Sequence, residues 1–581
     1  MAEVQGKKVT PTTLEALRPH FDAEHFPQFN RDTLEKRVVA LGGSSVLFRG
    51  LFVPEVEALN NKGITNLAIV SVSCGTEASS RAKADSFREQ GGLYTLHEHD
   101  GTVDRFRLIG SITDSIFATD EPAKVYNQIA DPRTQVVTMT ITSRGYNFKG
   151  VGSELDLDNP SVRQDIENPT TPVTALGYVL QGLALRQQAG QEPPIILPLE
   201  NVSDSGKVIK QALLTMAQER DKLHGTHLAE YVQDQVHVPQ TMVDKICPAL
   251  KDQTLEAERA NLAAHGVHDA LPVTGEPFGK LVIADTDPRI FDILPFQKLP
   301  ESNVAVASKE EMHAYEVGKL RMLNGGHRAI GILGLSAGEK IVHETIAKSA
   351  IRDFIHGMSR ETQQTLPEHA DMHKTFSPAT VISRFSNSSI QDDLGRLVDN
   401  SSGKLLDRIV RPIQHLRENG QNAPHLTFVM AAWFNLLRGE NDHGHPTAFK
   451  DDNAAKLGFV QAAKEVHAAW HEAKKADPAA QADLTPLLKL KDMQVLLGPL
   501  AQDEQFLGDI SRQMTSVWKI NEQRPGRGTL ETLQAVAQEV QPRRDALHAI
   551  ERTFSKDPVQ RCPLPDLVVQ SETPAKDRYL R

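Results

Sequence analysis

The sequence predicts an α/β protein, with an N-terminal Rossmann-like, doubly wound domain followed by a mainly α-helical C-terminal domain. Up to about residue 300, short apolar and β-branched runs alternate with helical segments, whereas beyond it apolar residues recur at helical spacing with few strand signals. The 581 residues are also too many for one ordinary core. We therefore expect an N-terminal extension over 1–36, the Rossmann-like domain over 37–300 and the helical domain over 301–581.

The composition excludes several classes of protein. A formal net charge of −11 argues against a general nucleic-acid or membrane-surface binder, which would carry a basic excess. The three cysteines, Cys74, Cys247 and Cys562, lie far apart without CxxC spacing, so they encode neither a disulfide framework nor a cysteine-built zinc site. The polar N-terminus lacks a signal-peptide core, and no apolar run reaches the roughly 20 residues of a membrane span. We expect a cytoplasmic protein with a small-molecule partner, no nucleic acid and no membrane.

The first predicted strand ends in a turn of small residues. The apolar run 37–41 leads into Gly42, Gly43 and Ser44, and a helix is predicted after them. Such a turn at a helix N-terminus lets backbone N–H groups and the helix dipole face a pyrophosphate. The full GxGxxG fingerprint is absent, so an ordinary strand-to-helix turn remains an equal alternative.

A second buried-type strand, 66–73, follows at the distance expected for one βαβ unit. An acidic residue after such a strand commonly contacts the ribose 2′-hydroxyl of a dinucleotide, a role that Glu77 suits. Ser79, Ser80 and Arg81 would suit a 2′-phosphate equally well. The expected cofactor is therefore NAD or NADP, with NAD preferred, and Glu77 and Arg81 are its candidate contacts.

The remaining elements follow from apolar periodicity. Exposed-face strands are predicted at 92–96 and 105–112, a central strand at 135–142, and further strands at 193–201 and 236–246. Helices are predicted at 174–189, 207–219, 339–358, 391–418, 424–439 and 454–475.

Three polar residues after position 318 form the most suggestive cluster. On an α-helix, Asn324 lies roughly 140° and His327 roughly 80° around the axis from Lys319, so the three can share one broad face. An amine, a carboxamide and an imidazole together would suit proton transfer and stabilisation of an oxyanion. In the alternative, this is a basic surface helix that ends at Gly325 and Gly326, and spacing alone leaves both open.

Several stretches together resemble the polyol-specific long-chain dehydrogenases, the family of mannitol 2-dehydrogenase, mannitol-1-phosphate 5-dehydrogenase, and fructuronate and tagaturonate reductases. The most specific match is a lysine, four residues, an asparagine, two residues and a histidine, here Lys319, Asn324 and His327. Further matches occur in the family's order at 91–96, 201–206, 241–246, 384–387 and 396–404. The resemblance runs from roughly residue 37 to residue 535.

Two motifs depart from the family's pattern. The glycine turn, commonly GxG followed by Phe and Arg, is here Gly42-Gly43-Ser44-Ser45 with Phe48 and Arg49 after it. The usual Thr-Glu-Lys-Gly-Tyr is here Thr-Ser-Arg-Gly-Tyr over 142–146, without the acidic residue. By resemblance, Phe48 joins Gly42, Gly43 and Ser44 as a cofactor-binding residue.

The resemblance implies a metal-independent, NAD(P)-dependent oxidoreductase that interconverts a polyol and a ketose of the mannitol and fructose type in the interdomain cleft. It implies that Lys319 is the general base, with a pKa lowered from its usual value near 10.4. Asn324 and Asn201 would donate hydrogen bonds to the reacting oxygen, and Glu316 would pass the proton to solvent. The remaining implied substrate contacts are His327, Asp244, Arg396 and Lys404.

Other functions are also compatible with these residues. A mannitol-1-phosphate 5-dehydrogenase or a hexuronate reductase would use Arg321, Arg328 and Lys404 to meet an anion, and a degenerate dinucleotide-binding regulatory protein is the non-enzyme alternative. Tyr315 and Lys319 also match the YxxxK of short-chain dehydrogenases, but they lie too far from the glycine turn, so Tyr315 is interpreted as packing. The histidines at 443 and 445 are interpreted as a loop, no metal is expected, and a monomer or weak homo-oligomer is expected.

Overall fold

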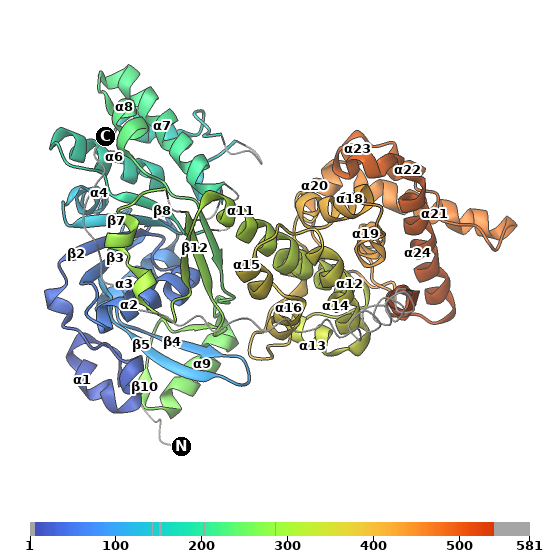
Figure 1. Cartoon of the computed structure of the whole chain (residues 1–581), viewed down its shortest axis with the longest axis horizontal. Helices are drawn as coiled ribbons and strands as arrows, with labels where there is room; N and C mark the ends of the chain where they lie inside the picture. The colour runs from blue at the N-terminus through green and yellow to red at the C-terminus, as the bar shows by residue number, and fades with distance from the viewer. Residues whose placement is uncertain (1–5, 142, 150–153, 201–203, 285, 540–581) are drawn as a thin grey trace, which may run out of the picture.

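The computed structural model describes residues 6–141, 143–149, 154–200, 204–284 and 286–539. It shows an N-terminal α/β part beside a helical C-terminal part (Figure 1), which confirms the predicted fold class. The described chain passes from one part to the other after strand β13 (Val304–Ala307), where helix α11 (Lys309–Gly318) begins.

The main sheet has five parallel strands and is buried on both faces. Its order is β6 (Ile112–Phe117), β3 (Leu67–Ser73), β2 (Lys36–Leu41), β7 (Thr134–Met139) and β8 (Ile195–Pro198). Successive side chains of β2 point to opposite faces, so Val38 and Ala40 enter one core and Val39 and Leu41 the other. This explains why the strands read as continuous apolar runs.

Helices cover both faces of the main sheet (Figure 1). One core includes side chains of α4 (Pro122–Ala130), α5 (Pro160–Glu167), α6 (Ala175–Gln188), α7 (Ser205–His224) and α8 (Leu228–Gln235). The opposite core includes side chains of α2 (Val53–Asn61), α3 (Ala78–Glu89) and α10 (Ile290–Ile293). The sheet is therefore doubly wound, as the sequence predicted.

A second, three-stranded sheet corrects the prediction of exposed-face strands. Its order is β11 (Val273–Gly275), β4 (Tyr94–His99) and β5 (Asp104–Ile109), and β6 begins separately, so the run 105–112 contains parts of two strands. Strand β4 is buried on both faces. Tyr94 joins the main core, while Thr95 on the other face donates to the Asp269 carboxylate. In β4, alternation of apolar and polar residues therefore reflects buried polar partners, whereas β5 is exposed at Asp104 and partly exposed over 105–107.

The N-terminal segment packs against the same region. Strand β1 (Lys7–Lys8) pairs with β10 (Val267–His268), and Val9, Leu17 and Phe26 are buried in a small core beside them. The described part of 1–36 thus packs against the N-terminal α/β part, and its status as a separate extension stays a prediction.

A third sheet joins the two parts of the molecule. Its order is β13, β12 (Lys280–Ala284) and β9 (Thr241–Asp244). Val243 and Ile283 pack into the N-terminal core, whereas Met242 and Val282 pack into the helical core. The two cores therefore share one sheet as a common wall. The domain boundary at 300 stays a prediction, and β13 lies just beyond it.

The helical part surrounds two buried helices, α12 (Gly325–Ser336) and α19 (Pro424–Leu436). The helices before α19 are α11, a π-helical turn η8 (Lys319–Asn324), α13 (Val342–Ala347), α14 (Ser349–Gln363), α15 (Ala370–Thr375), α16 (Pro378–Phe385), α17 (Leu394–Val398), a second π-helical turn η9 (Leu406–Val410) and α18 (Arg411–Glu418). Those after it are α20 (Asp452–Lys456), α21 (Phe459–Ala476), α22 (Thr485–Leu488), α23 (Lys491–Leu497) and α24 (Glu504–Gln523). The helical segments predicted between 339 and 475 are confirmed, although 339–358, 391–418 and 454–475 each contain more than one helix.

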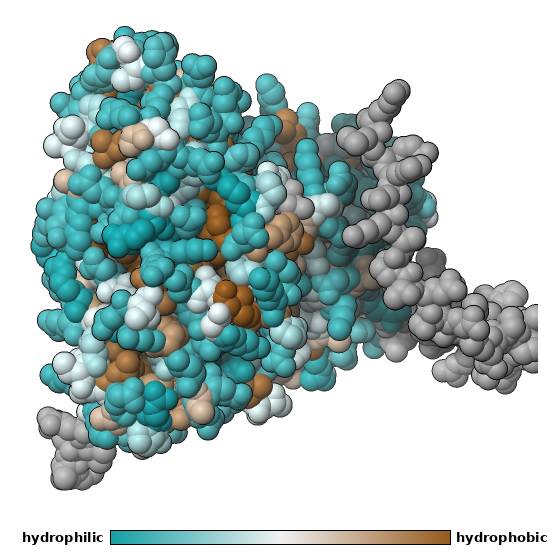
Figure 2. Space-filling model, turned by 60° about the vertical axis from the view of Figure 1, so that its left-hand side comes forward, coloured by the Kyte–Doolittle hydropathy of each residue, from teal (hydrophilic) through white to brown (hydrophobic). Residues whose placement is uncertain are grey.

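The surface is mainly hydrophilic on the face shown in Figure 2. The large apolar side chains that are exposed in the described chain are scattered singly: Val173, Leu223, Leu457 and Val495. Within the same residues, every helix is too short or too polar to cross a bilayer.

The shared sheet yields a stability prediction. Ile283→Ala removes a fully buried side chain from β12 and should lower the free energy of unfolding by about 2–5 kcal/mol, because a cavity replaces lost packing. Urea unfolding followed by circular dichroism measures the change. Val495→Ala is the control, because this side chain is 68% exposed and its loss should change stability by less than about 0.5 kcal/mol. Equal effects of the two substitutions would contradict the assignment of β12 to the core.

Candidate active site

The helix that carries Lys319 does not end at the two glycines. Helix α11, the π-helical turn η8 and helix α12 follow one another, and Gly325 has helical dihedrals, with φ −64° and ψ −46°. A Cβ on Gly325 would lie 3.1 Å from the Arg408 backbone oxygen, and one on Gly326 would lie 3.2 Å from the Phe385 ring. The glycines therefore permit close packing of η9 and α16 against this helix, and the alternative of a helix end is wrong.

The π-helical turn also brings Lys319, Asn324 and His327 closer to one line along the helix axis. A π-turn accommodates one more residue than an α-turn. Residues after η8 are therefore set back by about 100° relative to an uninterrupted α-helix. On this estimate Asn324 lies about 40° and His327 about 20° from Lys319, in place of the roughly 140° and 80° expected from the sequence. The three side chains thus share a narrow face.

The Lys319 amine is buried at the wall between the two cores. Its Nζ donates a hydrogen bond to the backbone oxygen of Val243 in β9. Burial is the largest influence and lowers the pKa of Lys319 to about 8, with Asp244 acting to raise it and Arg384 and Arg408 to lower it. At pH 7.5 about a quarter of the amine is then neutral, against about one part in a thousand for an unperturbed lysine. This is the protonation state that a base near neutral pH requires.

A buried ion network lies beside Lys319 and crosses between the domains. Arg384, at the end of α16, donates to both carboxylate oxygens of Asp244 at 2.8 and 2.9 Å and to both of Glu276 at 3.0 and 2.7 Å. Burial acts to raise the pKa of Asp244, but the Arg384 guanidinium holds it below its usual value. Both oxygens of Asp244 are thus engaged by Arg384, and its predicted contact with polyol hydroxyls stays a prediction.

His327 and Asn324 are available to a bound molecule. The His327 ring stacks on Phe385 with centroids 4.5 Å apart, and its buried Nε2 makes no hydrogen bond to any residue that the structure describes. Burial, aided by Arg384, lowers the pKa of His327 to about 3, so the imidazole is neutral at pH 7. The half-buried Asn324 carboxamide likewise has no hydrogen-bond partner in the described chain.

Glu316 lies one turn before Lys319 and is tied to the other domain. Its Oε1 accepts a hydrogen bond of 2.6 Å from Gln240, whose own Oε1 accepts one of 2.9 Å from the Gly206 backbone N–H at the start of α7. Burial raises the pKa of Glu316. Asn201, the predicted second oxyanion donor, lies outside the described residues, but the Gln240 bridge connects Glu316 to the helix that follows it.

The predicted substrate cations have different surroundings. Arg396 on α17 is largely exposed and paired with Asp392, and the exposed Lys404 donates to the Asp399 backbone oxygen at 3.2 Å. Arg408 on η9 was not predicted. It is half-buried, lowers the pKa of both Lys319 and His327 by its charge, and makes no hydrogen bond or ion pair through its guanidinium within the described residues.

The glycine turn has the geometry of a dinucleotide cradle. Gly42 has φ +76°, and a Cβ there would lie 2.2 Å from the Thr140 backbone oxygen. A Cβ on Gly43 would lie 2.6 Å from the buried Ser71 hydroxyl. The turn follows β2, where the chain order of the sheet reverses between β3 and β7, and such switch points are where doubly wound sheets bind ligands. Both glycines therefore fit a cofactor that approaches the backbone closely.

The other predicted cofactor contacts divide into two groups. Ser44 is half-buried in the same turn, near the Ser73 hydroxyl. Phe48, in contrast, is 1% exposed and stacks on Phe52 at 5.5 Å, so its side chain packs in the core behind the turn. The predicted role of Phe48 at the cofactor stays a prediction, and its buried side chain does not support a direct contact.

Glu77 and Arg81 follow β3, at the same edge of the sheet as the glycine turn. Glu77 is exposed at the N-terminus of α3, where its carboxylate accepts a hydrogen bond from Ser80. Arg81 forms an ion pair with Asp120, and its guanidinium lies 4.6 Å from the centre of the Phe117 ring. Arg81 is therefore already engaged, whereas Glu77 faces solvent.

One further buried carboxyl group, that of Glu200, was not predicted as a site residue. Glu200 follows β8 at the same edge of the sheet, and burial raises its pKa to about 8, with the Tyr146 hydroxyl acting to lower it. An acidic residue directly after a buried strand was the available signal for Glu200. For Arg384 the signal was a lone arginine on an otherwise apolar helix face; Arg408 had no local signal.

Comparison with known proteins places this geometry in a family. Residues 61–291 match the model of the mannitol dehydrogenase Rossmann domain, and residues 311–518 match that of the mannitol dehydrogenase C-terminal domain. Mannitol 2-dehydrogenase of Aspergillus fumigatus is 31% identical over 502 residues, covering 84% of this chain and 92% of the relative. D-mannonate oxidoreductase of Escherichia coli is 28% identical over 440 residues, covering 75% of this chain and 87% of the relative.

A solved structure shares the fold. The ternary complex of Pseudomonas fluorescens mannitol 2-dehydrogenase with NAD and D-mannitol aligns with a TM-score of 0.71 and 24% identity, covering 92% of this chain and all of that one. The matched models cover both domains, and the relatives align along nearly their whole length. The chain therefore belongs to the mannitol dehydrogenase family of oxidoreductases.

Proposed function

We propose that this protein is a metal-independent, NAD-dependent dehydrogenase that interconverts a polyol and a ketose of the mannitol and fructose type, with Lys319 as general base. The observation that carries the proposal is the buried Lys319 amine, with a pKa near 8, on one helix face with two unpartnered groups, His327 Nε2 and Asn324. The names of the A. fumigatus and P. fluorescens relatives support the substrate class. The site would lie between the domains 37–300 and 301–581.

In the oxidation of a polyol, neutral Lys319 takes the proton of the reacting hydroxyl while the carbon gives up a hydride. Bound nicotinamide supplies the hydride acceptor in oxidation and the hydride donor in reduction. The Asn324 carboxamide donates a hydrogen bond to the oxygen as it becomes a carbonyl, a contribution of about 3–4 kcal/mol by analogy with other oxyanion holes. Asn201 is proposed as the second donor, and His327 holds a neighbouring hydroxyl.

Glu316 is proposed to carry the proton from Lys319 towards solvent. Burial raises its pKa, which favours proton uptake relative to an ordinary glutamate, and Gln240 holds its carboxylate in place. In the alternative based on the YxxxK motif, Tyr315 would be the catalytic acid. Its hydroxyl instead donates a hydrogen bond to Asp371, and the Lys280 amine lies 5.3 Å from the centre of its ring. These contacts support Lys319, and not Tyr315, as the proposed base.

NAD is proposed as the cofactor in preference to NADP. Glu77 is exposed and suited to a ribose 2′-hydroxyl, whereas Arg81 would have to leave Asp120 to meet a 2′-phosphate. The complex of the P. fluorescens relative with NAD agrees with this choice. Metal independence belongs to the proposal because a neutral Lys319 amine would act as the base without a metal ion.

A second candidate substrate class is an acidic sugar, a hexuronate or a sugar phosphate. The Arg408 guanidinium has no partner in the described chain, and its charge adds to burial in lowering the pKa values of Lys319, His327 and Lys404. An unpaired, half-buried guanidinium suits a carboxylate or a phosphate. The E. coli D-mannonate oxidoreductase is a relative whose name denotes an acidic substrate.

Lys319→Ala should lower kcat for mannitol oxidation by a factor of about 10² to 10⁴, because the general base is removed. Titration of nicotinamide fluorescence should show NADH affinity within about threefold of wild type, since the glycine turn is in the other domain. Near-normal turnover would refute the role of Lys319.

Arg384→Gln should move the acid limb of kcat/KM for polyol oxidation to higher pH. The substitution removes a cation that lowers the pKa of Lys319 and leaves Asp244 to raise it, so the amine stays protonated to higher pH. Initial rates from pH 6 to 10 measure the shift. Arg384→Lys, which keeps the charge, should retain a limb near the wild-type position even if the protein is less stable.

Arg321→Gln is the matched control for Arg384→Gln. Arg321 belongs to the same π-helical turn as Lys319, but its guanidinium donates to the Thr365 backbone oxygen. Its loss should leave the pH profile unchanged. Equal profiles for Arg384→Gln and wild type would contradict the electrostatic role of Arg384.

A substrate panel separates the two substrate classes. Fructose, fructose 6-phosphate, fructuronate and tagaturonate are assayed with NADH and NADPH, and fructose with NADH is expected to give the highest kcat/KM. If an acidic sugar is preferred, Arg408→Ala should lower its kcat/KM by about 10- to 100-fold and leave that for fructose nearly unchanged. Arg411→Ala is the control, because Arg411 is paired with Asp407.

A further inference from the structure

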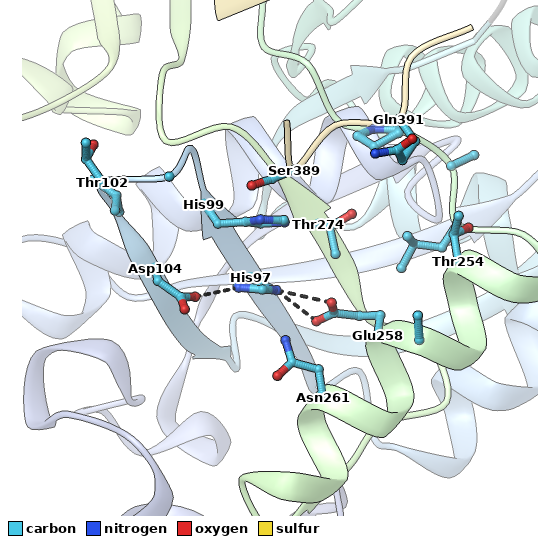
Figure 3. Close-up of a pocket in the computed structure, with 16 residues that line it drawn as sticks. His97, His99, Thr102, Asp104, Thr254, Glu258, Asn261, Thr274, Ser389 and Gln391 are labelled. Atoms are coloured by element: carbon cyan, nitrogen blue, oxygen red, sulfur yellow. Dashed lines mark hydrogen bonds and ion pairs between the residues drawn. The ribbon is translucent and has the colours of Figure 1, made fainter. Parts of the chain in front are cut away.

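A cavity lies away from Lys319, where the two domains meet. It has a volume of about 580 Å³ and lies between the β4–β5 hairpin, helix α9 (Asp252–Ala264) and residues 389–391 of the helical part (Figure 3). Cavities that bind small molecules commonly measure about 300–1,000 Å³. None of the candidate active-site residues lines it. It is therefore separate from the site proposed around Lys319.

One wall of this cavity is held rigidly by a histidine between two carboxylates. His97 Nδ1 lies 3.1 Å from both oxygens of Glu258, and its Nε2 lies 2.8 Å from Asp104 (Figure 3). Burial acts to lower the pKa of His97, but the two carboxylates raise it. The His99 ring stacks on His97 with centroids 4.1 Å apart, and Asn387 of the helical part donates to the His99 backbone oxygen at 3.0 Å. The wall is thus formed before any ligand binds.

The charge of the lining argues against an anionic ligand. No lysine or arginine is among the residues that line the cavity. Glu258 and Asp104 offset any positive charge on His97, and burial and His97 together lower the pKa of His99, which favours its neutral form. A phosphate or carboxylate would therefore meet a net negative wall without a counter-ion. A neutral molecule avoids this cost.

Several polar groups at the cavity have no partner. Thr274 is only 6% exposed, yet its hydroxyl makes no hydrogen bond to any residue of the described chain. The side chains of His99, Asn261 and Ser389 also lack hydrogen-bond partners there. Figure 3 shows His99, Thr274 and Ser389 around the same space. Hydroxyl, carboxamide and neutral imidazole groups both donate and accept, which matches a ligand rich in hydroxyl groups.

We propose that this cavity binds an uncharged, polyhydroxylated molecule of monosaccharide size. Its hydroxyls would form hydrogen bonds with Thr274 and His99 of the N-terminal domain and with Ser389 of the helical domain. Its C–H groups would contact the apolar side chains of the lining: Val103, Pro248, Ala249 and Leu250. Because the ligand touches both domains, it favours their docked arrangement. Helix α16 connects the two sites, since it ends with Arg384 and Phe385 just before Asn387.

Hydrogen–deuterium exchange of the full chain tests this proposal. D-mannitol and D-fructose are the probes, in the absence of nicotinamide cofactor. Either polyol should slow exchange at residues 248–261 and 386–392. Thr274→Val removes one hydroxyl at nearly constant shape and should raise the polyol concentration for half-protection of these segments about tenfold, the effect of one lost hydrogen bond. Ser389→Ala is the second variant, with the same expected direction.

Two controls separate this cavity from the Lys319 site. Both variants should keep kcat for the catalysed reaction within about twofold of wild type, because neither residue is among the candidate active-site residues. D-gluconate, an anionic analogue, should give no protection at 248–261. The proposal is overturned if neither polyol slows exchange at these segments, if both variants retain the wild-type midpoint, or if D-gluconate protects them equally well.

Discussion

Burial of the Lys319 amine against strand β9 is the constraint on which the rest of the site depends. An ammonium group removed from water is costly, so the amine loses its proton at a much lower pH than usual. The Val243 carbonyl accepts a hydrogen bond from Lys319 Nζ and fixes its position. In the same strand, the Met242 side chain packs in the helical core and the Val243 side chain in the N-terminal core. One short strand thus joins the domains and orients the proposed base.

The charges around Lys319 form a balance that favours its neutral form. Asp244 alone would stabilise the ammonium, but both of its oxygens are bound to Arg384, which Glu276 also neutralises. Arg408 adds a positive charge without a partner in the described chain. Buried ion networks often contribute little net stability. Here the network has a different consequence, because its charges set the electrostatic potential at Lys319, the proposed base.

The fold and the central motif could be predicted because their signals are local. Apolar periodicity identified the strands and helices, and the spacing of Lys319, Asn324 and His327 identified the helix face. The π-helical turn was missed, since helical angles assume a regular α-helix. Arg384 was not assigned to the site because its partner Asp244 is 140 residues away, and a long-range ion pair leaves no sequence pattern. Phe48 matched a family motif but packs in the core.

The most direct test of this account is the pH dependence of the wild-type enzyme in both directions. In the proposed mechanism, neutral Lys319 acts in polyol oxidation and protonated Lys319 in ketose reduction. The value of kcat/KM should therefore rise with pH through about 8 in oxidation and fall through the same value in reduction. Initial rates with mannitol and NAD, and with fructose and NADH, measure both limbs. A common apparent pKa near 8 is the predicted result. A limb above pH 10, or its absence in both directions, would contradict the role of a buried Lys319 as the base.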